Sequence, residues 1–506
     1  MQNWLNKKNG AGALVVYLLT GLALYAGLLD KSFAADDYQV VYRVTQDGLL
    51  FPPGFFRPLS DLTIWLNGLY GGFHPIAYFS FNLLIHIAAA FAVFQFCRLS
   101  ATIWQITSPW FPFLGGLLFL VYPFHNEPVL WVVGRGASLA ALFGIIALCA
   151  VLSGWRQQTK LLVFTLCYFL SLAAYETLMP LPIIAALLVY YREPGNNSWN
   201  RWLGVGTLVF LAHILIRFTV SGGLLGNYAA HIRTQSLSIW GGHWLRLMAR
   251  LFVPPAPSYN QFLMQTAGLF LVLLGLILIF LRKHTNRETR SLLLLLFVLI
   301  QLSLIVPVSF PVSTRTSETD RLLYFPAIWV CLFLLVLGKG LFDRTSLRLI
   351  AYGGLVGVCV FFLLLNNSNW KSASQQSKSM LADLKKITAS GPVVLLNLPD
   401  EYYGAFMFRN GFREALLMEG IDTSRVSVVN QLRPQDYPDA ISLNVTDSLH
   451  ASLPPHHELQ ITANAVLLIN GNKDKSWAIP SRETVVGYWD KENFHWVHLP
   501  FKKTDD

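Results

Sequence analysis

Two adjacent carboxylates follow the first long apolar segment of the chain. Asp36 and Asp37 stand in the sequence Phe33-Ala-Ala-Asp-Asp-Tyr38. Two neighbouring carboxylates repel each other, so one of them can keep its proton to a higher pH and act as a general base near neutrality. The alternative is a solvated loop start that only ends the preceding helix. On the chemical interpretation, this pair holds the candidate catalytic residues.

A second polar group lies in a short turn between two apolar segments. It holds His125, Glu127 and Arg135, and Pro123 and Pro128 break the helices around it. A turn needs proline or glycine, but it does not need these three polar side chains together. Charged residues near a membrane are costly and usually functional. The alternative is an ordinary interfacial loop with aromatic anchors.

A third group is Glu318-Thr-Asp-Arg-Leu-Leu-Tyr324, at the start of another apolar segment. Its arginine, Arg321, suits a lipid phosphate, because a guanidinium binds phosphate oxygens through two parallel hydrogen bonds. The alternative is an anchor whose long stem reaches the membrane surface. Asn82 and His86 stand one helical turn apart within an apolar segment, where hydrogen bonding between helices is the expected role.

The composition excludes an ordinary soluble enzyme. Of the 506 residues, 54% are apolar and only 13% are charged, and the mean hydropathy is +0.46, whereas soluble domains carry about 25% charged residues. The formal net charge of +10 indicates basic cytoplasmic loops and anionic lipid rather than nucleic acid. The five cysteines form no CxxC motif, so neither a disulfide framework nor a zinc site is predicted.

About eleven apolar segments are long enough to be membrane spans. The pair at 161–175 and 177–191 is short, and one long kinked helix is the alternative there. The predicted spans lie near 11–29, 78–97, 109–124, 136–154, 161–175, 177–191, 202–219, 262–281, 291–308, 322–338 and 347–365. The predicted fold class is mainly α, a polytopic membrane helix bundle with a small C-terminal α/β domain.

The basic residues favour a cytoplasmic N-terminus, which places the C-terminal domain on the extracytoplasmic side. We expect two domains: residues 1–366, with outer loops 30–77 and 220–261, and residues 367–506. Apolar spacing predicts a helix lying on the membrane surface over Leu59–Leu69. In the second outer loop, Ile239–Phe252 places Trp240, Trp244 and Leu247 on one side, with Arg246 and Arg250 nearby. The elements expected in the C-terminal domain are a helix over Trp370–Ile387, strands over Val393–Leu396 and Arg425–Val429, and a hairpin of Thr484–Trp489 with Phe494–Leu499 across Asp490–Asn493.

The order of these motifs resembles the membrane part of the GT-C superfamily of glycosyltransferases. The likeness is greatest to the transmembrane, tetratricopeptide-repeat O-mannosyltransferases and their bacterial relatives. This chain departs from their pattern at Tyr122 and Tyr175, where they have His and Lys, and it has no tetratricopeptide repeats. The matching motifs, in family order, are the acidic pair, Phe56-Arg-Pro-Leu-Ser60, Asn82-Leu-Leu-Ile-His86, Tyr122-Pro-Phe-His-Asn-Glu-Pro-Val129, Gly134-Arg135, Ala174-Tyr-Glu-Thr177 and Asp320-Arg-Leu-Leu-Tyr-Phe-Pro326.

The resemblance implies an inverting transfer of a sugar from a polyprenyl-phosphate donor to a hydroxyl group of a protein or glycan acceptor at the outer membrane face. Asp36 or Asp37 would be the base, and Arg321, with Arg57 or Arg135, would stabilise the departing phosphate. His125 and Glu127 would orient the acceptor or the sugar. Glu176 and Tyr324 complete the substrate-binding residues that the resemblance implies. No cofactor is expected, and dependence on a divalent metal stays open.

Two other interpretations remain at this stage. A transporter or lipid-carrier flippase predicts charges along a pathway and symmetry between halves of the chain, and the sequence shows no internal repeat. A lipid-linked glycan polymerase or ligase would not require the acidic pair. The expected location is a bacterial inner membrane, with no nucleic-acid partner.

Overall fold

The computed structural model describes residues 2–52, 54–223, 235–256, 258–280, 287–342, 344–432, 443–445, 449–453, 457–461, 466–470, 484–489 and 493–498. The chain divides into two compact units, which are described separately. The first comprises Met1–Asp30 and Arg43–Ser368, and the second comprises Lys31–Tyr42 and Asn369–Asp506.

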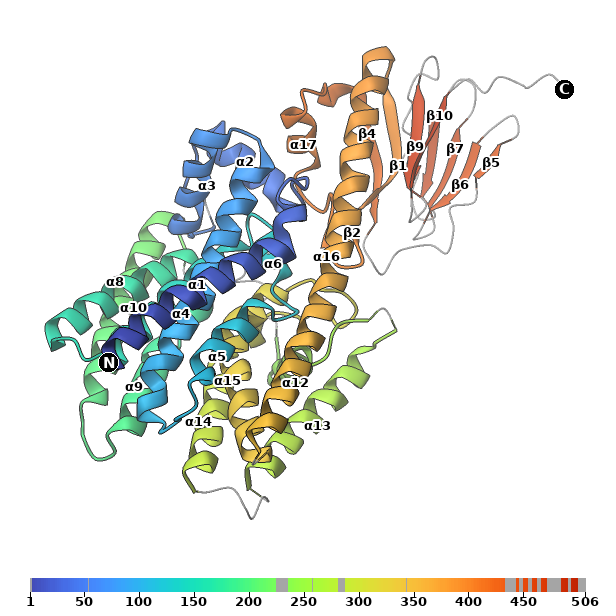
Figure 1. The fold of residues 1–506 in the computed structure, drawn as a ribbon. Helices are drawn as coiled ribbons and strands as arrows, with labels where there is room; N and C mark the ends of the chain where they lie inside the picture. Colours follow the sequence, from blue (N-terminus) through green and yellow to red (C-terminus); the bar gives the residue numbers. More distant parts are fainter. Residues whose placement is uncertain are drawn as a thin grey trace. The chain divides into compact units, whose positions relative to one another are not determined.

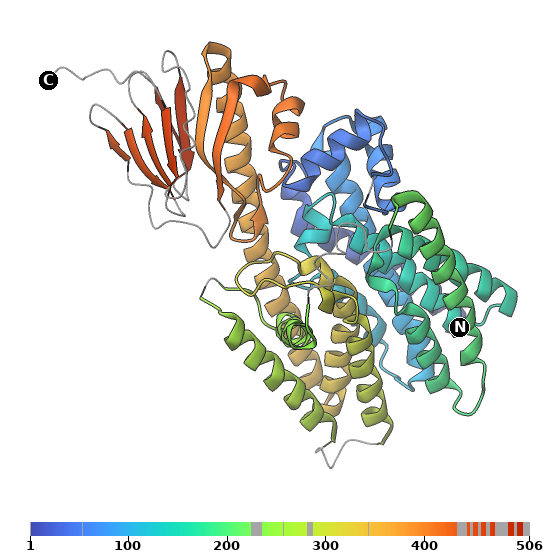
Figure 2. The same ribbon diagram turned by 180° about the vertical axis from the view of Figure 1, so that it is seen from behind.

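The first unit is a bundle of helices, most of which are labelled in Figure 1, and Figure 2 shows it from behind. Every predicted apolar segment falls on one of these helices, and residues 161–191 form two separate helices. The helices are α1 (Gln2–Tyr25), α3 (Pro58–Gly71), α4 (Pro75–Ile103), α5 (Trp110–Leu120), α6 (Asn126–Leu130), α7 (Arg135–Leu152), α8 (Gln157–Ala174), α9 (Leu181–Arg192), α10 (Trp199–Ser221), α12 (Leu237–Arg250), α13 (Gln261–Phe280), α14 (Arg287–Ser303), α15 (Tyr324–Leu341) and α16 (Thr345–Ser390), the last continuing into the second unit.

Among the described residues, seven helices are long and apolar enough to cross a membrane. The seven stretches are Gly10–Leu28, Pro75–Ile103, Arg135–Leu152, Trp199–Ser221, Gln261–Leu278, Asp320–Leu341 and Thr345–Ser390. The prediction of a mainly helical, polytopic membrane protein with a small C-terminal sheet region is therefore confirmed, and we describe the chain as an integral membrane protein.

Burial separates the central helices from the peripheral ones. In α15, 83% of the apolar stretch is buried inside the protein, whereas in α16 the share is 11%. The central α15 packs against α5, α7 and α14. The exposed apolar side chains of the peripheral helices suit contact with lipid, because hydrocarbon tails can cover them as well as protein can.

Short breaks between the helices position the polar residues of the first unit. The helix α6 has only five residues and lies between α5 and α7. Pro123 lies between α5 and α6, and Pro128 lies in the first turn of α6, where a helix tolerates proline. Between α8 and α9, Tyr175 takes extended backbone angles and the 3₁₀ turn η2 (Glu176–Leu178) follows. The helix predicted over Leu59–Leu69 is α3, and Ile239–Phe252 falls mostly on α12.

The second unit is an α/β structure. Its first sheet has the strand order β10-β9-β1-β4, with β1 parallel to both β4 and β9, and β9 antiparallel to β10. The C-terminal part of α16 packs on it, and Trp489 Nε1 donates to Gln376 Oε1 at 3.1 Å. The strands of this sheet are β1 (Val393–Pro399), β4 (Val426–Leu432), β9 (Val485–Trp489) and β10 (Phe494–His498). The unit also holds the start of α2 (Asp36–Thr45), and β2 (Glu401–Tyr402), β3 (Ala405–Phe406) and α17 (Phe412–Met418).

The predicted C-terminal elements are confirmed with two differences. The helix expected over 370–387 is continuous with the last predicted span in the single helix α16. A second antiparallel sheet, of order β5-β6-β7-β8, was not predicted. Its strands are β5 (Leu443–Val445), β6 (Leu449–Leu453), β7 (His457–Ile461) and β8 (Val466–Asn470). Residues 490–492 and 499 of the predicted hairpin, and 224–234 and 257 of the predicted outer loop, lie outside the described residues.

Candidate functional site

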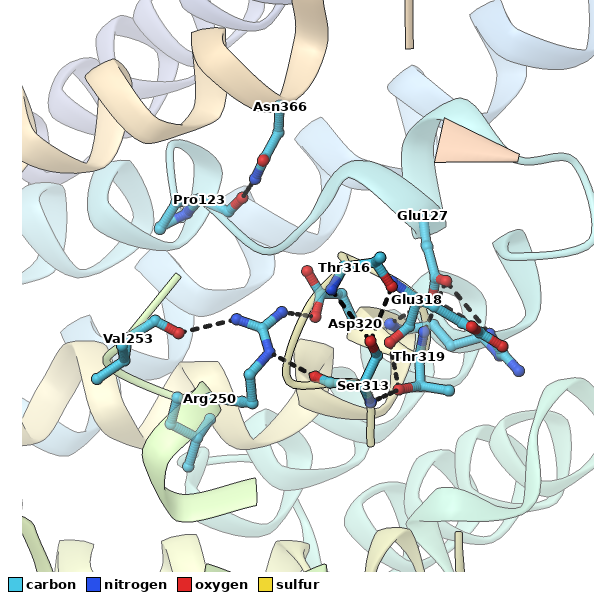
Figure 3. Close-up of polar contacts among 12 residues, drawn as sticks. Pro123, Glu127, Arg250, Val253, Ser313, Thr316, Glu318, Thr319, Asp320 and Asn366 are labelled. Carbon is cyan, nitrogen blue, oxygen red and sulfur yellow. Dashed lines mark hydrogen bonds and ion pairs between the residues drawn. The ribbon is translucent and has the colours of Figure 1, made fainter. Parts of the chain in front are cut away.

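Glu127 and Arg321 belong to one polar group of the first unit. Figure 3 shows Glu127 beside Glu318, Thr319 and Asp320 of the loop that it contacts. The Glu127 carboxylate accepts hydrogen bonds from the backbone N–H groups of Thr319 and Arg321, both at 2.8 Å. Arg321 Nη1 also donates to Glu127 Oε2 at 3.2 Å, and its guanidinium lies 5.0 Å from the Trp131 ring centroid. Burial raises the pKa of Glu127, although the Arg321 guanidinium and the two N–H groups oppose that shift.

A second buried ion pair anchors the same loop. Arg250, at the end of α12, forms an ion pair with Asp320, and both side chains are fully buried. Arg250 also donates to the backbone oxygens of Ser313 at 3.1 Å and Val253 at 2.8 Å, as Figure 3 shows. The residues around Arg321 are therefore held from two directions, by α6 through Glu127 and by α12 through Arg250.

His125 and Tyr324 lie beside this group and are both fully buried. Their ring centroids are 4.3 Å apart. Burial, and then the nearby His86, lower the pKa of His125 well below its ordinary value, so the ring is neutral near pH 7. His86 contacts the Leu120 oxygen through Nε2 at 3.0 Å and the Tyr324 hydroxyl through Nδ1 at 2.7 Å. Because a carbonyl only accepts, Nε2 carries the hydrogen, and the Tyr324 hydroxyl donates to Nδ1.

Arg57 and Glu176 form a separate group with Arg217. Arg57 Nη2 lies 3.2 Å from Glu176 Oε2, and Arg217 Nη1 lies 2.8 Å from Glu176 Oε1. The Arg57 guanidinium lies 4.4 Å from the Tyr175 ring centroid. Burial raises the pKa of Glu176, but the two arginines outweigh it and hold that pKa below its ordinary value. The group carries one more positive charge than negative.

Arg135 lies apart from both groups and is surrounded by protein acceptors. Its guanidinium donates to Asn82 Oδ1 at 2.8 Å, Asn67 Oδ1 at 2.7 Å, Thr63 Oγ1 at 3.3 Å and the Tyr78 oxygen at 3.1 Å. The side chain is fully buried. Arg135, on α7, therefore links α7 to α3 and α4 through these hydrogen bonds.

The acidic pair belongs to the second unit. Asp37 is fully buried, and one of its oxygens accepts the Ala34 N–H at 3.3 Å. Asp36 is partly exposed and accepts a hydrogen bond from Asn410 Nδ2 at 2.5 Å. Nearby, burial lowers the pKa of the Lys31 ammonium to about 7, and the Asp37 charge opposes that shift.

The structure thus groups His125, Glu127, Arg321 and Tyr324, and it groups Arg57 with Glu176. Arg135 belongs to neither of these groups, and Asp36 and Asp37 lie in the other unit. Sequence reasoning did not assign Arg250 or Arg217 a role at the site, because only their positions at the ends of helices set them apart. Among the described residues, no group of three or more His, Cys, Asp and Glu side chains could hold a metal ion.

No family model matches the chain. The chain is 30% identical over 148 residues to protein O-mannosyl-transferase TMTC2 of Homo sapiens, and this match covers 25% of this chain and 17% of that protein. It is 34% identical over 211 residues to protein O-mannosyl-transferase Tmtc1 of Drosophila melanogaster, and this match covers 40% of this chain and 22% of that protein. The match thus spans about a fifth of the length of these relatives.

Among solved structures, the chain is similar to ArnT from Cupriavidus metallidurans bound to undecaprenyl phosphate. The TM-score is 0.40 at 12% identity, with 83% of this chain and 90% of that chain covered. For arabinofuranosyltransferase AftD from mycobacteria, the TM-score is 0.45 at 14% identity, with 83% of this chain and 32% of that chain covered. The resemblance to the transmembrane O-mannosyltransferases that the motifs predicted is confirmed by the sequence matches.

Proposed function

We propose that the chain is a membrane glycosyltransferase that moves a sugar from a polyprenyl-phosphate carrier to a hydroxyl group of a protein or glycan acceptor. The observation that carries the proposal is the Glu127–Arg321 pair. A buried carboxylate holds an arginine whose side chain remains 23% exposed, at the start of the central apolar helix α15. A lipid-linked sugar would present its phosphate at such a membrane edge.

Arg321 is the proposed phosphate-binding residue, with Arg57 as a second candidate. Their side chains are 23% and 18% exposed, whereas Arg135 is fully buried and donates to four protein acceptors. A guanidinium can bind two phosphate oxygens at once. We therefore assign the phosphate role to Arg321 and Arg57 and a structural role to Arg135.

Asp36 is the proposed general base. It is partly exposed, whereas Asp37 is fully buried, and a base must reach the acceptor proton within hydrogen-bond distance. On the proposed topology, Asp36 follows the first span and Glu127 follows the third, so both lie on the extracytoplasmic face. The same topology places the N-terminus in the cytoplasm, and we propose a bacterial inner membrane as the location.

The proposed reaction is a single displacement. The acceptor oxygen bonds to the anomeric carbon while Asp36 takes the hydroxyl proton. The bond between that carbon and the phosphate oxygen breaks, its electron pair stays on the phosphate, and polyprenyl phosphate leaves from the opposite side, so the configuration inverts. The positive charge of Arg321 stabilises the phosphate as it leaves. His125, Glu127, Glu176 and Tyr324 shape the binding site, and no cofactor takes part in this scheme.

Mannose is the first sugar to test, because the relatives that match in sequence are named O-mannosyl-transferases. The purified full chain is incubated with undecaprenyl-phosphate [³H]mannose or with GDP-[³H]mannose, using detergent-treated membranes as the source of acceptors. The proposal predicts label in material insoluble in organic solvent only with the lipid-linked donor. Transfer from GDP-mannose alone, or from neither donor when other lipid-linked sugars also fail, would contradict it.

A further inference from the structure

The segment Lys31–Tyr42, which carries the acidic pair, is built into the C-terminal unit. The backbone N–H of Ala35 donates to the Met407 oxygen at 2.8 Å. The backbone N–H of Ser32 donates to Ser374 Oγ at 2.7 Å. Residues separated by more than three hundred positions are therefore joined just before the acidic pair.

Ring contacts fix the same segment. The Lys31 ammonium lies 5.0 Å from the Trp370 ring centroid, and the Tyr38 ring stacks on the Phe408 ring with centroids 6.2 Å apart. Lys31 and Tyr38 are each 4% exposed. Burial of this extent before and after the acidic pair anchors this part of the segment in the core of the unit.

Closest to the carboxylates lies the turn Asn410–Gly411. Asn410 Nδ2 donates to Asp36 Oδ1 at 2.5 Å. Gly411 has a φ of +79°, and a Cβ there would meet the Gln39 nitrogen at 2.8 Å and the Ala35 oxygen at 3.1 Å. Only glycine allows both this backbone conformation and this approach. Ala35 itself has a φ of +47°, a conformation that costs free energy and must be held by its surroundings.

We propose that Asn410 is a positioning residue for Asp36, and that the C-terminal unit sets the geometry of the general base. This inference rests on the proposed function, in which Asp36 takes the acceptor proton. A carboxylate at the start of a helix has several rotamers, and the amide of Asn410 selects one of them by donating to a single oxygen. The other oxygen can then accept the proton of the acceptor.

The first test compares turnover in variants of the full chain. Asn410→Ala removes the donor and should lower kcat about 10-fold. Asn410→Asp keeps the shape of the side chain but places a carboxylate against Asp36, so we expect a loss of about 100-fold. The KM for undecaprenyl-phosphate mannose should not change in either variant. Asn369→Ala is the matched control, since Asn369 also donates within this unit, to the Tyr403 oxygen.

A merely structural role would make Asn410→Asp the milder of the two changes, because it keeps the volume. That order, or wild-type kcat in both variants while Asp36→Asn is inactive, would overturn the positioning role and leave the proposed function standing. If Asp36→Asn itself keeps wild-type turnover, the assignment of the base fails, and with it this inference.

A second measurement does not depend on activity. Hydrogen–deuterium exchange of the full chain should show faster exchange at residues 31–42 in Gly411→Ala and in Asn410→Ala, and wild-type exchange in Asn369→Ala. Unchanged exchange at 31–42 in both of the first two variants would show that the turn does not hold the segment, which would also overturn the proposal.

Discussion

Glu127 binds Arg321 at two places, because its carboxylate accepts both the backbone N–H, at 2.8 Å, and the guanidinium Nη1, at 3.2 Å. The two contacts fix both the path of the loop and the direction of the side chain. An arginine whose backbone and head group are held by one buried carboxylate is preorganised, so little conformational entropy is lost when it binds an anion.

We predict that Glu127→Gln destabilises the protein and reduces turnover. An amide has one acceptor oxygen, so one of the two backbone N–H groups loses its partner at a cost of about 1–3 kcal/mol. Thermal unfolding in detergent and the transfer assay measure the two effects. Glu193→Gln is the control, because the Glu193–Arg192 ion pair is exposed and its loss should cost less than about 1 kcal/mol. Equal stability of the two variants would contradict the role assigned to Glu127.

Arg321→Lys should lower kcat by roughly 10- to 150-fold, which corresponds to the loss of one bidentate contact worth about 1.5–3 kcal/mol. If the contact tightens as the phosphate leaves, the loss appears in kcat more than in donor affinity. Arg315→Lys is the matched control, since Arg315 lies in the same loop and is exposed. Unchanged kcat and affinity in Arg321→Lys would make this arginine a membrane anchor and transfer the phosphate role to Arg57.

For Arg135, the expected effect is on folding. Arg135→Lys cannot reach all four acceptors, and leaving buried polar groups such as Thr63 and Asn82 without a partner costs about 1–3 kcal/mol each. We expect a lower midpoint of thermal unfolding with an unchanged KM for the donor in the molecules that remain folded. A raised KM at wild-type stability would instead support donor binding by Arg135.

Length and hydropathy alone predicted the positions of the long apolar helices in the first unit, because a buried or lipid-facing helix needs a continuous apolar run. The five-residue helix α6, inside a segment interpreted as a turn, was not predicted. The strands β1, β4, β9 and β10 were also predicted, since Val, Leu and aromatic residues concentrate in them. The sheet β5–β8 was not, because its short strands, such as His457–Ile461, mix polar and apolar residues.

The partners of the charged residues could not be predicted. Arg250 pairs with Asp320 seventy positions away, and Arg57 pairs with Glu176 across more than a hundred. A single sequence gives the residue types but not the long-range contacts that a fold creates. For the same reason, Asp36 and Asp37 were predicted to lie in an outer loop of the membrane domain. The structure instead places their segment, Lys31–Tyr42, in the C-terminal unit.

Lys31 gives a pH prediction. Burial, and the repulsion of Lys378, lower the pKa of its ammonium from 10.5 to about 7, against the attraction of Asp37. Between these two values the unfolded chain binds more protons at Lys31 than the folded chain, so the free energy of unfolding rises with pH in this window. The midpoint of thermal unfolding of the wild type should therefore rise relative to that of Lys31→Met between pH 7 and pH 9.

The exposed Lys385 on α16 provides the control, because Lys385→Met should follow the wild type across the same pH range. Parallel curves for the wild type and Lys31→Met would show that Lys31 titrates alike in the folded and unfolded chains.

The proposed orientation is tested with reporters that are active only outside the cytoplasm. A fusion after residue 370 should be active, and a fusion after residue 287 should be inactive. With the N-terminus in the cytoplasm, eleven predicted spans precede residue 370 and place it outside, whereas eight precede residue 287 and place it inside. Activity at 287 with none at 370 would reverse the topology and remove Asp36 and Glu127 from the extracytoplasmic face.

The central claim is that Asp36 activates an acceptor for transfer of a sugar from a lipid phosphate. The most direct measurement is the release of undecaprenyl phosphate from undecaprenyl-phosphate [³H]mannose by the wild type, Asp36→Asn and Asp37→Asn, each at matched thermal stability and with the same membranes as the source of acceptors. We predict acceptor-dependent release by the wild type and a loss of about 10²- to 10⁴-fold in Asp36→Asn. Wild-type release by Asp36→Asn would contradict the claim.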